Sequence, residues 1–198
     1  MTREAKTRFE VHELIRRRWS PYALDPDRSI NAAELESLFE AAAWAASSFN
    51  EQPWRFIVAR KEQSGEFSRM LACLMEANQV WARNASALVL GLTRDAFTRN
   101  GKPNRVALHD LGLAAGSLTL EATYRGMVVH QMAGIEAQKI VETYGVPAGF
   151  TPQTAIAIGY PADPSILPEE LRGRDTGERT RKELGEFVFV EKWENPMG

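Results

Sequence analysis

The sequence has few residues that could form disulfides or bind metal, and no apolar run long enough to cross a membrane. Cysteine occurs once and histidine three times in 198 residues, which excludes an internal disulfide and argues against a zinc site. The longest apolar stretches, such as 86–92 and 111–120, are shorter than the roughly 20 residues of a membrane-spanning helix. The first residues lack the apolar core of a secretory signal. We therefore expect a cytoplasmic protein with no metal and no membrane attachment.

An excess of charge of one sign is also lacking. The chain has 24 Lys and Arg against 26 Asp and Glu, for a formal charge of −2. No whole-molecule field therefore attracts nucleic acid or an anionic membrane, and we expect neither as a partner. Any anion must be held by a local cluster of basic residues.

The common nucleotide and hydrolase signatures are missing too. The sequence contains no Gly-x-Gly-x-x-Gly, no Gly-x-x-x-x-Gly-Lys-Ser/Thr, no Gly-x-Ser-x-Gly and no His-Glu-x-x-His. His109 and Asp110 suggest a base and its orienting group, but neighbouring residues on a helix do not face each other. We interpret Asp110 as a structural hydrogen-bonding group near a helix start.

What is present is the composition of one globular domain over residues 1–198, with 44% hydrophobic and 25% charged residues. Apolar spacing predicts helices over 11–18, 31–46 and 104–125, and buried strands over 54–60, 86–93, 127–131 and 154–159. Interleaved helices and strands indicate a layered α+β or α/β structure. Prolines and glycines predict a loop over 161–177, followed by an isolated terminal strand over 187–190.

Two features of these elements carry structural expectations. Cys73 lies in an apolar setting with no neighbouring base, which predicts a core residue. Gly112 and Gly116 give the long helix a small-residue face, which favours either a buried internal contact or a contact between subunits.

Two basic runs can offer guanidinium groups to a phosphate. Arg16-Arg17-Arg18-x-Ser20 lies where a helix meets a loop, and Arg179-x-Arg181 lies near the other end of the chain. Each run can equally be a solvated helix end or loop. The two runs can only meet in the folded chain.

The stretch over 45–57 is more specific, because small polar residues after a helix lead through Asn50-x-Gln-Pro-Trp54 into a strand. It resembles the Pro-Ser-x-x-Asn-x-Gln-Pro-Trp-x-Phe signature of the FMN-dependent nitroreductase family. Arg18-x-Ser20-x-x-Ala-Leu24 is similar to the family's N-terminal Arg-x-Ser-x-Arg/Lys-x-Phe motif. The resemblance continues through the central helix, Met132-Ala-Gly134, Ile158-Gly-Tyr-Pro161 and Arg179-x-Arg181, and so covers nearly the whole chain.

The resemblance implies an α+β fold with a mixed central sheet flanked by helices, and a homodimer whose C-terminal stretch, residues 187–193, reaches onto the partner. It implies FMN as cofactor and NADH or NADPH as electron donor. The FMN-binding residues that it implies are Arg17, Arg18, Trp19, Ser20, Tyr22, Ser47, Ser48, Asn50, Asn78, Ala133, Gly134, Arg179 and Arg181.

These residues divide by the part of FMN that each suits. The arginines and Ser20 would hold the phosphate and ribityl chain, while Asn78 would hydrogen-bond the pyrimidine edge. Ala133 and Gly134 would lie beside the isoalloxazine, where a larger side chain would obstruct close approach. Ser47, Ser48 and Asn50 would come from the partner subunit.

One departure from the family pattern affects the expected chemistry. Tyr22 stands where the family usually has a second Arg or Lys, whose charge would stabilise the reduced anionic flavin. Its loss would lower the flavin's reduction potential unless Arg17 or another cation substitutes. Ala46 in place of Pro, and Leu24 and Ile135 in place of aromatics, are milder packing changes.

The function implied is ping-pong transfer of a hydride from NAD(P)H through the flavin to an electron-poor acceptor such as a nitroaromatic, quinone or enal. The flavin supplies the reactivity, so we expect no catalytic side chain. Phe49 and Trp81 are candidates to line the acceptor pocket, with core packing as the alternative for both. A specialised flavin reaction (dehalogenation or flavin cleavage), a non-catalytic flavin-binding protein and a plain interaction domain stay open.

Overall fold

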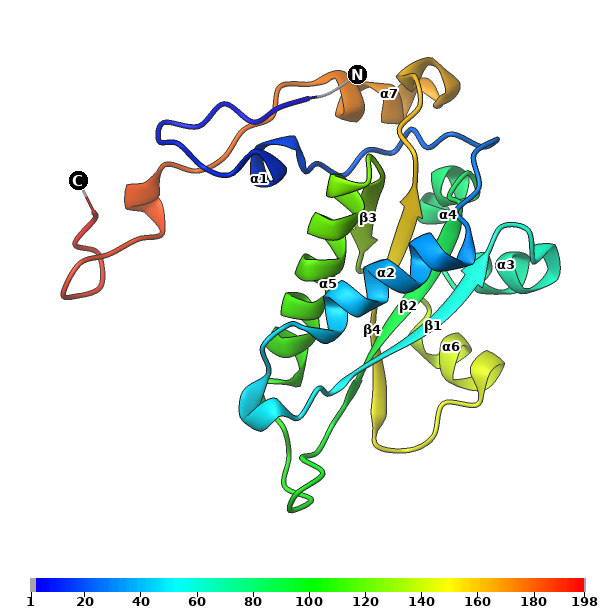
Figure 1. Cartoon of the computed structure of the whole chain (residues 1–198), viewed down its shortest axis with the longest axis horizontal. Coiled ribbons are helices and arrows are strands. Elements are labelled where there is room, and N and C mark those ends of the chain that lie inside the picture. The colour runs from blue at the N-terminus through cyan, green and yellow to red at the C-terminus, as the bar shows by residue number, and fades with distance from the viewer. Residues whose placement is uncertain (1–2, 198) are drawn as a thin grey trace.

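Four antiparallel strands form the sheet on which the rest of the chain packs. The computed structural model describes residues 3–197 (Figure 1). The strand order is β1 (Trp54–Arg60), β2 (Ala87–Arg94), β4 (Phe150–Gly159), β3 (Val128–Met132). The α+β class is confirmed. All three pairings are antiparallel, so a mixed sheet would need a parallel strand that residues 3–197 do not supply.

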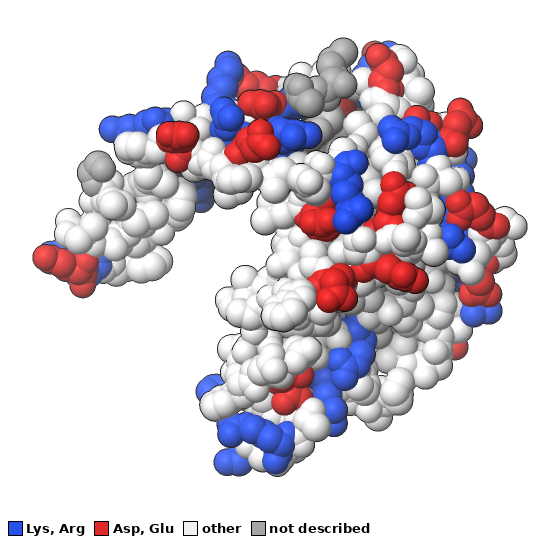
Figure 2. Space-filling model, viewed as in Figure 1, with Lys and Arg blue, Asp and Glu red and all other residues white. Residues whose placement is uncertain are grey.

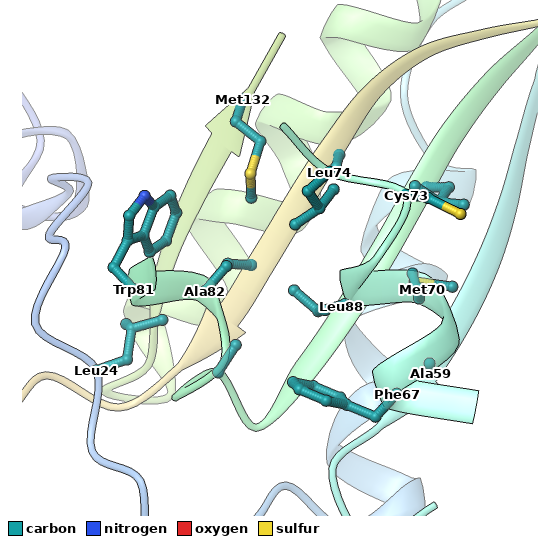
Figure 3. Packing of buried hydrophobic residues seen from close by; sticks show 14 of the residues in the cluster. Leu24, Ala59, Phe67, Met70, Cys73, Leu74, Trp81, Ala82, Leu88 and Met132 are labelled. Atoms are coloured by element: carbon teal, nitrogen blue, oxygen red, sulfur yellow. The ribbon is translucent and has the colours of Figure 1, made fainter. Parts of the chain in front are cut away.

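Helices cover both faces of the sheet. On one face lie α2 (Ala32–Ala43) and α5 (Ala107–Tyr124), and on the other lie α3 (Ser64–Leu71), α4 (Glu76–Ala82) and α6 (Ala137–Tyr144) (Figure 1). Each layer encloses its own apolar core. In the core beneath α3, α4 and α6, Cys73 is fully buried with Met70 and Leu74, as its sequence setting predicts (Figure 3).

Local signals explain where the main elements begin. The Asn31 side chain accepts from the Glu34 amide at 2.8 Å, and Glu34 accepts from the Asn31 amide at 3.0 Å, so the expected cap of α2 is a complete capping box. β2 is a continuous apolar run that is buried on both faces of the sheet. The four strands predicted from sequence are all present, with ends shifted by a few residues.

Two expectations for the C-terminal third are wrong. The predicted loop over 161–177 contains η2 (Pro164–Ile166) and the helix α7 (Glu169–Thr176). Pro168 followed by two glutamates is a helix-start signature that outweighs the glycines further along. In the described part of the chain, the predicted strand over 187–190 makes only an isolated bridge between Phe189 and Pro196, because this segment lies away from the sheet.

The N-terminal segment and the residues after α7 lie side by side beyond α5 (Figure 1). α1 (Glu13–Arg17) lies near this end of α5, and residues after α7 run back along the N-terminal segment. Residues 182–197, which include η3 (Leu184–Glu186), then extend away from the sheet as a C-terminal arm. Among residues 3–197, no helix is long and apolar enough to cross a bilayer.

The small-residue face of α5 is open. Within residues 3–197, no atom outside the helix itself lies within 4 Å of a Cβ built at Gly112 or Gly116. The internal contact that the sequence suggested for these glycines is therefore not formed, and a contact between subunits is the interpretation left.

Candidate functional site

A cavity of about 410 Å³, which we call the large cavity, opens between α5, β3 and the extended segment that follows α1. Polar, small and aliphatic side chains line it, so it offers both apolar contact and hydrogen bonds to a bound molecule. Its lining residues are Arg18, Ser20, Gly116, Thr119, Leu120, Val129 and Gln131. Here the first basic run of the sequence meets the central helix.

The segment after α1 divides the basic run between two cavities. Arg18 has extended backbone angles, and successive side chains of an extended segment point to opposite sides. Arg18 Nη1 donates to Ser20 Oγ at 3.1 Å in the large cavity. Arg17 and Trp19 instead line a separate cavity of about 100 Å³ beside Gly126. The structure thus separates Arg17 and Trp19 from the residues with which they were expected to act.

The two basic runs do meet. Burial and the nearby charge of Arg181 lower the pKa of Arg18, and burial together with Arg18, Arg181 and Arg3 lowers the pKa of Arg179. Among the described residues, no Asp or Glu oxygen lies within 4.0 Å of a side-chain nitrogen of Arg18, Arg179 or Arg181. A cluster of like charges without a carboxylate is stabilised by a bound anion, and guanidinium forks match a phosphate.

Arg179 and Arg181 take different parts in this cluster. Arg179 donates to the backbone carbonyls of Arg3, Arg16 (3.0 Å) and Arg18 (2.8 Å), and so fastens the C-terminal segment to the N-terminal one. Arg181 is exposed, and its Nη1 donates only to the adjacent Thr180 carbonyl at 2.7 Å. Most donors of Arg181 are therefore free for an anion, whereas most donors of Arg179 are engaged.

A buried carboxylate that the sequence did not reveal holds the same segment. Asp175 in α7 is 2% exposed and accepts from the Tyr22 amide at 2.9 and 3.0 Å and from the Ala23 amide at 2.8 Å. It therefore fixes the backbone just after Ser20. A single Asp within a helix of mostly exposed, charged residues carries no pattern that distinguishes it.

Tyr22 packs into an aromatic group rather than into the cavity. Its ring makes edge contacts with Trp81 at 5.2 Å and with His130 at 4.6 Å between centroids, and its hydroxyl accepts from Arg174 Nη1 at 3.1 Å. Arg174 thus places a cation beside Tyr22, the residue that stands where the family usually has Arg or Lys. Burial lowers the pKa of His130, against the opposing effects of the Pro21 carbonyl and Asp175.

Neither of the two candidates for an acceptor pocket lines the large cavity. Trp81 is 1% exposed and packs in the core near Leu24 and Ala82, so the expectation that it lines a pocket is corrected to core packing (Figure 3). Its size and apolar ring are used to fill space under the sheet. Phe49 is 71% exposed, with its ring 3.8 Å from the Arg99 guanidinium, and lies outside the large cavity.

Asn78 and Gly134 are in contact, as expected for one site. Asn78 Nδ2 donates to the Gly134 carbonyl at 3.0 Å, and a Cβ at position 134 would lie only 2.4 Å from Asn78 Nδ2. Only glycine allows this approach without displacing the amide. Ala133 next to it is exposed.

Ser47, Ser48 and Asn50 lie at the other end of α5. The Ser48 amide donates to Asp110 Oδ2 at 3.1 Å, nine residues along the helix from Thr119, which is roughly 13 Å. Asp110 is 2% exposed and is the structural group that we expected. However, its Oδ1 does lie 3.2 Å from His109 Nδ1, so the argument that these neighbours cannot meet is wrong.

Most of the chain is similar to known proteins. Residues 15–160 match the nitroreductase family. The chain belongs to this family. An uncharacterized 15.4 kDa protein of Mycolicibacterium smegmatis is 32% identical over 149 residues, 72% of this chain and 99% of that one. The Major NAD(P)H-flavin oxidoreductase of Aliivibrio fischeri is 29% identical over 46% of this chain and 41% of its own length.

A solved structure resembles the whole of this nitroreductase-family chain. It is described as an oxidoreductase containing FMN, with a TM-score of 0.89, 36% identity and 95% coverage of each chain. The fold implied by the sequence resemblance is therefore confirmed. Sequence reasoning missed Thr119 and Gln131 in the cavity, because each looks like an ordinary polar residue of a helix or an edge strand.

Proposed function

We propose that this protein is an FMN-dependent NAD(P)H oxidoreductase that acts as a homodimer. The observation that carries the proposal is the arginine cluster without a carboxylate partner at the edge of the large cavity. Belonging to the nitroreductase family and the similarity to a structure containing FMN support the same cofactor. NAD(P)H as donor suits a cytoplasmic enzyme.

The residues present fit FMN at both of its ends. Arg18 and Arg181 have free donors for a phosphate dianion, with Ser20 beside them. At the other end, the backbone at Gly134 is kept open by the lack of a side chain, and Asn78 is held against it. Arg179 supports the phosphate site chiefly by fixing the Arg16 and Arg18 carbonyls.

The surface around the site supports a dimer. The exposed face of α5 carries Leu108, Leu113, Leu120 and Tyr124, and the C-terminal arm carries exposed Phe187 and Trp193. Figure 2 shows a hollow between the arm and the body whose walls are largely uncharged. A second copy would cover these apolar surfaces and would bring the partner subunit's Ser47, Ser48 and Asn50 to the flavin site.

When bound, FMN would supply the redox chemistry, which is ping-pong hydride transfer from NAD(P)H to an electron-poor acceptor such as a nitroaromatic, quinone or enal. The protein's own residues bind and orient. Arg18 and Arg181 hold the phosphate, Asn78 holds the ring edge, and α5 and β3 exclude water from one face of the cavity. Arg174, on the Tyr22 hydroxyl, offers a positive charge near the position where the family has a base.

Initial-rate kinetics and flavin titration test the proposal together. The protein should bind one FMN per subunit, and rates at varied NAD(P)H and acceptor should give parallel double-reciprocal lines. Absence of FMN binding would refute the cofactor assignment. Binding without turnover with any nitroaromatic, quinone or enal would favour a binding protein or a specialised reaction of the flavin.

A further inference from the structure

Gln131 and Thr119 form a polar pair in the large cavity. Neither residue belongs to the arginine cluster. Gln131 is exposed on β3, and its side chain lines the cavity together with Val129 on the same strand face. Its Nε2 donates to Thr119 Oγ1 at 3.3 Å. Thr119 itself is 5% exposed and donates to the Ala115 carbonyl at 2.7 Å.

These bonds determine which way the Gln131 amide points. The Thr119 hydroxyl has one hydrogen, which goes to the Ala115 carbonyl, so its oxygen can only accept from Gln131. The amide must therefore present Nε2 to Thr119 and leave Oε1 for another partner. Among residues 3–197, no donor is within hydrogen-bond distance of Oε1. Gln131 thus offers the cavity an oriented acceptor with no protein partner.

The position of the pair between the two ends of the site indicates its ligand. Arg18 and Ser20 line the same cavity at the phosphate end, while Ala133 follows Gln131 by two residues, roughly 7 Å along an extended chain. The part of FMN that joins phosphate to ring is a polyol, whose hydroxyls donate hydrogen bonds. We propose that Gln131 Oε1 accepts from a ribityl hydroxyl, with Thr119 as its positioning residue. This inference rests on the proposed FMN site.

Flavin titration of Gln131→Leu tests the assignment. FMN and riboflavin both carry the ribityl chain, whereas lumiflavin has only the ring, and affinities can be read from quenching of flavin fluorescence. Losing one hydrogen bond should weaken FMN and riboflavin by the same factor, about three- to tenfold, and leave lumiflavin unchanged. Arg181→Ala should weaken FMN alone, since only FMN carries the phosphate.

Gln153→Leu is a matched control. Gln153 on β4 donates to Thr93 Oγ1 at 2.9 Å, the same type of pair, but it does not line the cavity. It should change no flavin affinity. Thr119→Val removes the positioning acceptor while Gln131 stays, so it should weaken riboflavin less than Gln131→Leu does.

Three results separate the possible failures. Wild-type protein that binds no FMN would refute the proposed function itself. Normal FMN binding with FMN and riboflavin affinities within twofold of wild type in Gln131→Leu would overturn the ribityl contact alone. Equal weakening of riboflavin and lumiflavin would also overturn it, because the residue would then act on the ring or on the shape of the cavity.

Discussion

At the scale of residues, the arginine cluster contains two side chains with free donors and one whose donors bind the backbone. Arg18 and Arg181 repel each other and have donors to spare, whereas Arg179 is engaged by three backbone carbonyls. The motif Arg179-x-Arg181 alone does not distinguish these parts. Only the folded chain shows which arginine meets the carbonyls after α1.

Removing both free arginines should weaken FMN binding. In Arg18→Ala with Arg181→Ala, each lost charged hydrogen bond costs about 1.5–3 kcal/mol, so affinity should fall at least a hundredfold. Fluorescence titration measures this directly. Arg83→Ala, a substitution of an exposed arginine that donates only to the Val80 carbonyl, should bind FMN as wild type does. Unchanged affinity in the double variant would contradict the phosphate site.

His130 should make stability depend on pH. Burial lowers its folded-state pKa below the ordinary value of 6.5, so the unfolded chain binds more protons in the range between the two pKa values. The free energy of unfolding therefore falls as pH drops through 6.5 and levels off below the folded pKa. The groups facing the ring, Asp175, Arg18 and the Pro21 carbonyl, modify the shift without reversing it.

Urea unfolding at pH 7.5 and 5 measures this effect. His130→Gln should lose less stability on acidification than wild type, because its side chain takes up no proton. Equal losses in the two proteins would show that His130 is not the group responsible.

At the scale of elements, α7 was not predicted from the sequence, yet it holds a segment of the proposed site. Asp175 on this helix bonds the Tyr22 and Ala23 amides, and so sets the path of the segment that carries Arg18 and Ser20. Tyr22 in turn accepts a hydrogen bond from Arg174 on the same helix. α7 therefore supports the backbone of the proposed cofactor site.

Asp175→Asn should destabilise the protein by about 1–3 kcal/mol, because one amide oxygen replaces two charged acceptor oxygens in a buried position. FMN affinity should fall as well, since the Ser20 backbone is then less firmly placed. Urea unfolding and flavin titration give the two numbers. Asp163→Asn at an exposed cap is the control, and equal effects from the two substitutions would contradict the role of Asp175.

Much of the fold follows from local pattern, and much of the site does not. Local sequence patterns predict the capping box at Asn31, the buried apolar run of β2 and the long helix α5. Contacts such as Asn78 with Gly134 could be expected from family resemblance. Pairs that depend on tertiary placement, such as Gln131 with Thr119, carry no local signal.

At the scale of the whole molecule, one subunit supplies only part of the proposed site. Arg18 and Ser20 lie toward one end of α5 and the stretch 47–50 lies at the other, so the proposed dimer would bring them to one flavin from different subunits. The open, apolar face of α5 lies between them. A two-fold pairing of α5 faces would unite the two ends, each from a different subunit.

Leu113→Asp should therefore disrupt both assembly and cofactor binding. Leu113 is 41% exposed on α5, and a charge there would be buried in a dimer interface. Sedimentation velocity should show a dimer for wild type and a shift to monomer for the variant, with weaker FMN binding. Ile166→Asp, at a site 45% exposed outside this face, should remain dimeric. A monomeric wild-type protein that binds FMN would contradict the shared site.

A stepwise anaerobic reduction, followed by absorbance, tests the proposed oxidoreductase activity most directly. Purified protein loaded with FMN is mixed with NADH or NADPH, and a quinone or nitroaromatic is added after the excess donor is removed. The yellow colour should bleach with at least one of the two donors and return with the acceptor. Bound flavin that neither nucleotide bleaches would contradict an NAD(P)H oxidoreductase.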